Sequence, residues 1–301
     1  MFVKNCHIVD PWCRQAPTGQ EPVNGARHLP ETALCLVCLQ LTKEKMENRK
    51  SGLLEYATGS WPLDTDKPTL VFIHGSSQNR LFWRTQVQDL VDVANTIAID
   101  LPGHGTSPGP GYDHVTDYAR DVMTFIHEEK IPHPIPCGLS LGGAITLELL
   151  IDHGDRFPAG ILMNTGARLK VNPFIFETIQ KDFNKFLESL LSTGISGKSD
   201  ADALRPVIRE TSACLPEVAL GDYQACNRFD VMDRLHLIKT PVLVLTATDD
   251  VLTPVKYGLF MAEKIAGASV HSIEDAGHLS PLEKPHEVNN AIRDFLRRLP
   301  D

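Results

Sequence analysis

Short runs of apolar residues alternate with longer amphipathic segments along most of this chain, and no other feature limits its fold as strongly. The runs are rich in β-branched residues, a pattern typical of strands that are buried on both faces of a parallel sheet. They lie at residues 69–73, 96–100, 160–163 and 241–246. Between them, apolar residues recur at helical spacing, most clearly at 115–126 and 288–299. This alternation predicts an α/β fold with a doubly wound, mostly parallel sheet.

One stretch lacks the alternation. Residues 168–239 contain no strand-like run, although large apolar residues recur at helical spacing between 174 and 190. We therefore expect a helical insertion at 168–239. The core would then consist of residues 49–167 and 240–301.

The first 48 residues differ from the rest of the chain. Four prolines and two glycines interrupt them, and no helical or strand period is sustained. We expect residues 1–48 to form a poorly ordered appendage. Residues 1–45 would be dispensable for folding, because Met46 opens a segment typical of the start of a compact domain. Cys35 and Cys38 have the spacing of half a zinc site, but no second pair of ligands follows, so we expect no bound metal.

The composition argues against several kinds of partner. The chain has 301 residues, with 38 acidic and 29 basic side chains and a formal net charge of −9, so it lacks the basic surplus that phosphate contacts need. No run approaches the roughly 20 apolar residues of a membrane span, and the N-terminal sequence does not resemble a secretory signal. We expect a cytoplasmic protein that binds neither nucleic acid nor membranes. The sequence does not indicate an oligomeric state.

The segment Gly138-Leu-Ser-Leu-Gly142 contains the pattern G-x-S-x-G between a strand-like approach, 131–136, and a helix-like run, 144–151. A strand that turns sharply into a helix packs its backbone so tightly that glycine is needed on both sides of the turn. The turn raises the hydroxyl of Ser140 above the sheet and directs a helix N-terminus at a developing oxyanion. We therefore predict that Ser140 is a nucleophile.

A nucleophilic serine needs a histidine to accept its proton and an acid to orient that histidine. His278 is the strongest candidate among the 12 histidines, because it follows the strand-like residues 268–273 and precedes the last helix. Asp249 and Asp250 both follow the run at 241–246, so the acid is one of these two. Either choice gives the chain order serine, acid, histidine that is expected of this architecture.

Taken together, these motifs resemble the α/β-hydrolase superfamily over about residues 50–299. Residues 74–76, HGS, resemble the oxyanion loop of the family, and residues 100–107, DLPGHGTS, resemble its D-x-P-G-x-G-x-S loop. The acid of the family stands four residues before a proline. Pro254 therefore selects Asp250, although Ala247 replaces the usual glycine.

The resemblance also implies roles for backbone groups and for the loop residues near the elbow. The backbone N–H groups of Ser76 and Leu141 would form an oxyanion hole, and the helical insertion would cap the active site. We expect Asp100 to accept hydrogen bonds from turn amides rather than to bind a metal. His74 and His104 would brace loops around the site.

By resemblance, the predicted activity is the hydrolysis of carboxylic esters, which needs no cofactor. Ser140 would form an acyl-enzyme while His278 transfers the proton and Asp250 orients the imidazole. The aromatic residues of the insertion favour small to medium, apolar-leaning substrates, with Phe174 and Phe183 as candidate substrate-binding residues. An aromatic stripe at helical spacing also fits packing between the insertion and the core.

Other reactions fit the same residues. The serine, acid and histidine could cleave a carbon–carbon bond in an aromatic ring-cleavage product, although residues 76–79 lack the glycine-rich run of those relatives. A lactonase or a perhydrolase would use the same three residues. A relative without catalysis is the alternative from another class, and it would be recognised by a broken elbow or triad.

Overall fold

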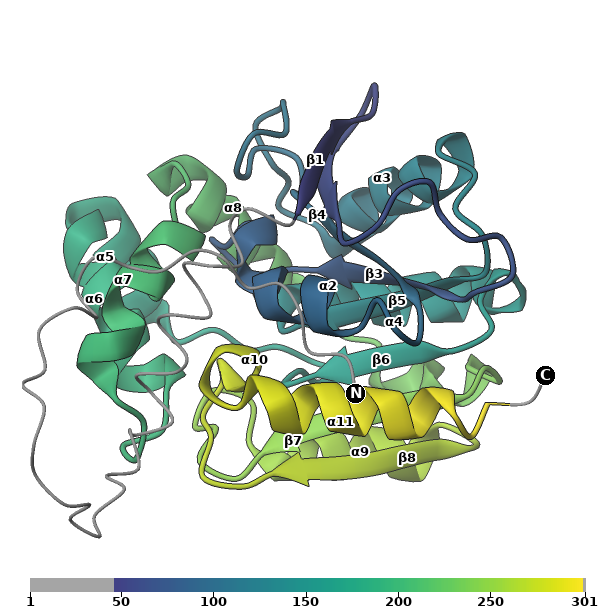
Figure 1. Ribbon diagram of the computed structural model, residues 1–301. Helices are drawn as coiled ribbons and strands as arrows, with labels where there is room; N and C mark the ends of the chain where they lie inside the picture. The colour runs from purple at the N-terminus through teal and green to yellow at the C-terminus, as the bar shows by residue number, and fades with distance from the viewer. Residues whose placement is uncertain (1–45, 300–301) are drawn as a thin grey trace, which may run out of the picture.

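The computed structural model describes residues 46–299 (Figure 1). The expectations for residues 1–45, including those for Cys35 and Cys38, lie outside the described residues. The expected domain boundary at residue 48 falls inside the first strand, which begins at Glu47.

The centre of the fold is a sheet of eight strands in the order β1-β2-β4-β3-β5-β6-β7-β8. The pairs β1–β2 and β2–β4 are antiparallel, and the five remaining pairs are parallel, which confirms the predicted mostly parallel sheet. The strands are β1 (Glu47–Lys50), β2 (Glu55–Thr58), β3 (Thr69–Ile73), β4 (Asn95–Ile99), β5 (Pro134–Leu139), β6 (Gly160–Met163), β7 (Val242–Ala247) and β8 (Ala268–Ile273).

Helices cover both faces of this sheet, as the doubly wound prediction requires. One face is covered by α3 (Val115–Glu128), α4 (Leu141–His153) and α9 (Val255–Lys264), and the other by α2 (Arg84–Asp89) and α11 (Pro285–Leu296). Figure 1 shows α11 in front of the sheet, running alongside β8. Short helical segments η2 (Arg80–Trp83), η3 (Gly154–Arg156) and α10 (Ser280–Glu283) complete the connections in the core.

Alternate residues of the buried strands enter the two apolar layers. In β3, Val71 and Ile73 belong to the layer under α3 and α4, whereas Leu70 and Phe72 belong to the layer under α2 and α11. All five residues of this strand are buried. Burial on both faces explains why the strands of the parallel part appear in the sequence as continuous apolar runs.

The helical insertion lies between β6 and β7, at one end of the sheet (Figure 1). It contains α5 (Pro173–Lys181), α6 (Phe183–Gly194), α7 (Ala201–Thr211) and α8 (Pro216–Arg228), followed by η4 (Met232–Leu237). We refer to these elements as the cap. The cap has its own apolar cluster, in which Ile179, Phe186 and Ala219 are buried. Within residues 46–299, no helix is both long enough and apolar enough to cross a membrane.

Candidate active site

The predicted site residues follow strands of the parallel part of the sheet. Ser76 follows β3, Ser140 follows β5, Asp250 follows β7 and His278 follows β8. The carboxyl ends of parallel strands lie at one edge of a sheet, where open α/β sheets bind their ligands. The topology therefore brings four sequence segments that are far apart in the chain to one edge.

Ser140 lies at the sharp turn between β5 and α4. Its backbone has φ 54° and ψ −113°, a left-handed conformation that costs energy for a residue with a Cβ atom. A Cβ atom at Gly138 would collide with the backbone of Gly142, and one at Gly142 would collide with the carbonyl of Ile73. Both flanking glycines are therefore sterically required, as the sequence pattern predicts.

His278 and Asp250 form a buried pair. The Nδ1 atom of His278 lies 2.9 Å from Oδ2 of Asp250. The other carboxylate oxygen accepts hydrogen bonds from the backbone N–H groups of Leu252 (2.8 Å) and Thr253 (2.9 Å). Burial by itself raises the pKa of Asp250, but His278 and the donors of Thr253 outweigh it and lower that pKa to about 2. Asp250 therefore stays ionised beside the imidazole at neutral pH.

The second candidate acid, Asp249, makes different contacts. Its carboxylate accepts a hydrogen bond from the hydroxyl of Ser196 (2.5 Å) in the cap and lies 3.7 Å from the ammonium of Lys198. Of the two aspartates that the sequence left open, Asp250 is the one in hydrogen-bond contact with His278.

The end of β6 connects the serine and histidine loops, a feature that sequence analysis missed. The side-chain amide of Asn164 donates to the carbonyls of Gly277 (3.0 Å) and His278 (2.8 Å). The hydroxyl of its neighbour Thr165 donates to the carbonyl of Ser140 (2.8 Å). Two consecutive residues thus hold both loops. Their place directly after a buried strand is the one sequence signal that could have identified them.

The loop after β3 is held by side chains on both sides. The backbone N–H of Gly75 donates to the side-chain oxygen of Gln78 (2.9 Å), and the N–H of Ser77 donates to Asp222 of the cap (2.7 Å). Within residues 46–299, the backbone N–H groups of Ser76 and Leu141 make no hydrogen bond. Their role as an oxyanion hole stays a prediction.

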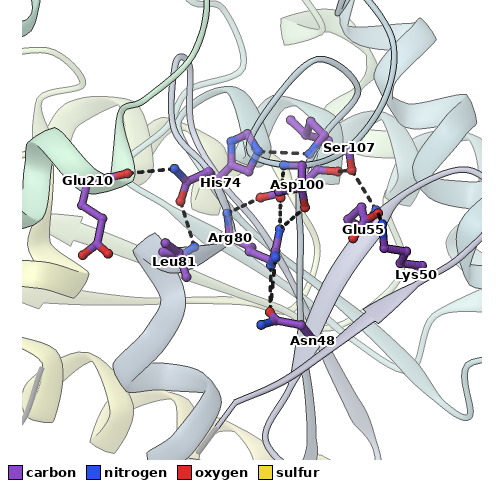
Figure 2. Close-up of polar contacts among 12 residues, drawn as sticks. Asn48, Lys50, Glu55, His74, Arg80, Leu81, Asp100, Ser107 and Glu210 are labelled. Carbon is purple, nitrogen blue, oxygen red and sulfur yellow. Dashed lines mark hydrogen bonds and ion pairs between the residues drawn. The ribbon is translucent and has the colours of Figure 1, made fainter. Parts of the chain in front are cut away.

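Asp100 anchors the start of η2, as Figure 2 shows. Its carboxylate accepts hydrogen bonds from the backbone N–H groups of Arg80 (2.7 Å) and Thr106 (2.9 Å) and forms an ion pair with the Arg80 guanidinium, which also contacts Asn48 of β1. The expectation that Asp100 binds turn amides is confirmed. The contact with Asn48 places β1 against the same turn.

His74 and His104 are buried next to one another, with ring centroids 4.8 Å apart. The Nε2 atom of His74 accepts from the N–H of Leu101 (3.1 Å), so its Nδ1 atom carries the proton and donates to the carbonyl of Gly75 (2.8 Å). Burial, together with the charge of His104, holds the pKa of His74 well below its usual value. His74 is therefore a neutral brace between two loops, in line with its expected structural role.

Unlike His74, His104 is protonated on both ring nitrogens. Its Nε2 atom faces Oδ2 of Asp222 (2.9 Å) and its Nδ1 atom faces the carbonyl of Pro102 (3.1 Å). Both partners are acceptors, so both nitrogens carry protons and the ring is an imidazolium. Burial opposes this charge, but Asp222 outweighs burial and raises the pKa of His104.

The two aromatic residues predicted to bind substrate lie in the cap. Phe174 in α5 is 57% exposed. Phe183 in α6 is partly buried and stacks on Phe186, with ring centroids 5.4 Å apart. The packing within the cap accounts for Phe183, and a role of either residue in substrate binding stays a prediction.

Comparison with known proteins identifies the family. The model of the alpha/beta hydrolase family matches residues 70–291. The chain belongs to this family.

Two curated relatives cover most of the α/β hydrolase described here. The chain is 27% identical over 253 residues to 3-oxoadipate enol-lactonase 2 of Acinetobacter baylyi. The alignment covers 81% of this chain and 93% of the relative. It is 25% identical over 247 residues to the pimeloyl-[acyl-carrier protein] methyl ester esterase of Nitrosospira multiformis. This alignment covers 75% of the chain and 94% of the relative.

Solved structures agree with the fold of this α/β hydrolase. A thermophilic esterase from Thermogutta terrifontis superimposes with a TM-score of 0.72 at 26% identity, covering 84% of this chain and 98% of the other. The enol-lactonase from Burkholderia xenovorans has a TM-score of 0.73 at 22% identity, covering 84% of this chain and 100% of the other. The second likeness supports the fold alone.

Proposed function

We propose that this α/β hydrolase is a serine hydrolase that cleaves carboxylic esters through an acyl-enzyme. The observation that carries the proposal is the arrangement at the edge of the sheet. Ser140 stands on a strained turn. Asp250 follows β7 and His278 follows β8, and Asn164 ties the His278 loop to the end of β6 beside that turn. Within residues 46–299, the Nε2 atom of His278 makes no hydrogen bond, so it is available to accept a proton.

The proposed mechanism assigns one task to each group. His278 takes the hydroxyl proton as Ser140 attacks the acyl carbonyl, and then gives it to the leaving alcohol. A water molecule activated by the same imidazole releases the acid. Asp250 holds the Nδ1–H tautomer and stabilises the imidazolium. The N–H groups of Ser76 and Leu141 would stabilise the tetrahedral oxyanion, a contribution of about 3 kcal/mol per donor in comparable sites.

The proposed substrate class draws on the relatives and on the composition of the cap. The curated relatives include an enol-lactonase and a methyl ester esterase, at 27% and 25% identity. The preference for small to medium, apolar-leaning acyl groups rests on the apolar residues of α5 and α6, which pack around Phe186.

The test is the hydrolysis of p-nitrophenyl esters of increasing acyl-chain length by the unaltered protein, Ser140→Ala and Ser192→Ala. Ser192 is an exposed serine of α6, so its variant is a matched control. We expect turnover that disappears in Ser140→Ala and persists in Ser192→Ala. The chain-length profile then measures the acyl pocket. Turnover that persists in Ser140→Ala would contradict the proposal.

Lactone hydrolysis is the second candidate, favoured by the likeness to the enol-lactonase of Acinetobacter baylyi. A lactone is a cyclic ester, so the same nucleophile and base would open it, and the leaving alcohol would remain attached to the acyl group. A set of lactones assayed beside the acyclic esters distinguishes the two activities by their relative kcat/KM.

A further inference from the structure

Helix α8 of the cap carries a completely buried carboxylate that accepts hydrogen bonds from three donors of the core. Asp222 in α8 accepts hydrogen bonds from the backbone N–H of Ser77 (2.7 Å), the hydroxyl of Tyr118 in α3 (2.6 Å) and the Nε2–H of His104 (2.9 Å). A buried charge is costly unless it is paired and fully hydrogen bonded. In Asp222 both oxygens have partners: Oδ1 accepts from Tyr118, and Oδ2 accepts from Ser77 and His104.

One of these donors belongs to the loop that follows β3. Ser77 has φ 58°, a left-handed conformation that is uncommon for a residue other than glycine. Its N–H points to Asp222, and its hydroxyl donates to the carbonyl of Ser76 (2.6 Å). Asp222 thus fixes the peptide plane between Ser76 and Ser77. The N–H of Ser76 belongs to the preceding peptide plane, which meets the fixed plane at the Cα atom of Ser76, so only the φ and ψ angles of Ser76 can turn one plane relative to the other.

A second side chain of α8 reaches the same loop. Cys226 follows Asp222 by four residues and therefore lies on the same helix face. Its Sγ atom is 3.5 Å from the hydroxyl oxygen of Ser76. On the core side, Gln78 accepts from the N–H of Gly75. The loop is held between the core and the cap.

The charge of Asp222 is balanced locally. A lone carboxylate next to this loop would oppose an oxyanion that forms there, since like charges in a medium of low dielectric constant repel strongly. The imidazolium of His104 contacts the same Oδ2 atom that accepts from Ser77. The pair is therefore neutral as a whole, and the carboxylate can anchor the loop without a net negative charge.

From these contacts we propose that Asp222 is a positioning residue that holds the Ser76–Ser77 loop in the geometry for oxyanion binding. Stabilisation of the transition state then depends on how α8 of the cap is seated. The inference rests on the proposed function, since an oxyanion forms only if Ser140 attacks an acyl carbonyl. It goes further by making a cap residue part of the oxyanion apparatus.

The kinetic test compares Asp222→Ala, Asp222→Asn and Tyr118→Phe. Tyr118→Phe is the matched control, because it removes a donor to the same carboxylate without touching the bond to Ser77. We expect Asp222→Ala to lower kcat by about 10- to 100-fold with KM nearly unchanged, the scale of a displaced oxyanion donor. Binding of a trifluoromethyl ketone, which mimics the oxyanion, should weaken by a similar factor, whereas binding of the product carboxylic acid should not.

The conservative variant Asp222→Asn distinguishes a role in positioning the Ser76–Ser77 loop from a general effect on the stability of the protein. Asparagine keeps an acceptor for Ser77, so Asp222→Asn should recover most of the lost kcat. Where Asp222→Ala does not fold, Asp222→Ser should show the same loss of kcat, because the shorter serine side chain does not reach the N–H of Ser77. Equal losses of kcat in Asp222→Ala and Tyr118→Phe, or an unchanged kcat in a folded Asp222→Ala, would overturn the proposal.

Hydrogen–deuterium exchange of residues 75–79 tests the position of the loop without any substrate. Exchange at Ser77 should accelerate at least about 10-fold in Asp222→Ala, because its N–H loses its acceptor, and should stay unchanged in Tyr118→Phe. Unchanged exchange in Asp222→Ala overturns the positioning role. A protein that turns over no ester contradicts the proposed function instead, and the exchange result still decides the role of Asp222.

Discussion

Two histidine–carboxylate pairs of the same length lie in this molecule, and they differ in what surrounds them. His278 is 2.9 Å from Asp250, and His104 is 2.9 Å from Asp222. Both nitrogens of His104 are engaged, and its side chain is fully buried. His278 retains an unbonded Nε2 atom within the described residues, and its side chain is 8% exposed.

The comparison separates two uses of one interaction. With both nitrogens bound to acceptors, an imidazole is stabilised as a cation and has no free nitrogen that could accept a proton from a nucleophile. With one nitrogen bound to a carboxylate and the other unbonded, it can take up and release a proton. The distance within the pair does not distinguish these cases. What distinguishes them is whether the second ring nitrogen of the histidine has a hydrogen-bond partner.

Identical substitutions at the two histidines give the largest expected difference. His278→Gln should lower kcat/KM by about 10⁴-fold or more, as expected when a triad base is lost, whereas His104→Gln, which leaves the charge of Asp222 unbalanced, should lower it by no more than about 100-fold. The measurement is p-nitrophenyl ester hydrolysis, with circular dichroism as the check on folding. Equal losses at both positions would contradict the different roles of the two histidines.

Replacing the carboxylate of the first pair should have the next largest effect. Asp250→Asn keeps the size of the side chain but removes the charge that holds the His278 tautomer, so kcat should fall by about 10³- to 10⁴-fold. Asp249→Asn is the matched control, because Asp249 contacts Ser196 and Lys198 instead. A loss in Asp249→Asn as large as that in Asp250→Asn would contradict the assignment.

Stability should respond in the opposite order. Asp222→Ala leaves three buried donors without an acceptor and should lower the free energy of unfolding by about 3 kcal/mol or more. Asp250→Ala should cost less, because the side chain of His278 is 8% exposed and water can reach it. Urea denaturation of both variants tests this order, and a larger loss in Asp250→Ala would reverse it.

The smallest expected effect is a pH dependence. The pKa of His104 in the folded protein lies above its usual 6.5, since Asp222, the carbonyl of Pro102 and Asp100 outweigh burial; His74 and Tyr118 are the other rings that face it. A raised pKa stabilises the fold below pH 6.5, and this stabilisation is lost as the pH rises through the folded pKa. The difference in Tm between the unaltered protein and His104→Gln should therefore narrow with rising pH. A constant difference from pH 6 to pH 9 would contradict this assignment.

Most of the sheet could be predicted from the sequence, because burial on both faces leaves a visible apolar run. The run at 160–163 coincides with β6, and that at 69–73 with β3. β1 and β2 were missed. The residues of β1 are Glu-Asn-Arg-Lys, mostly exposed at the edge of the sheet, so no hydrophobic period marks them as a strand.

The candidate site divides in the same way. Ser140 and His278 follow strands in recognisable motifs, and Pro254 distinguishes Asp250 from Asp249 by spacing. Asp222 gives no such signal, because it is a single acidic residue in a helix and its partner Ser77 lies 145 positions away. A contact of this kind depends on the packing of the cap on the core, which local sequence patterns do not report.

The topology of the cap has a consequence for protein engineering. The two ends of the segment that carries α5 to α8 lie side by side, because the N–H of Val231 donates to the carbonyl of Ala167 (2.8 Å) and Arg168 pairs with Asp230 in a β-bridge. Such a segment could be exchanged between relatives without changing the sheet. A transplanted cap would nevertheless have to bring a carboxylate to the place of Asp222, since the core keeps a buried cation and a strained loop that need it.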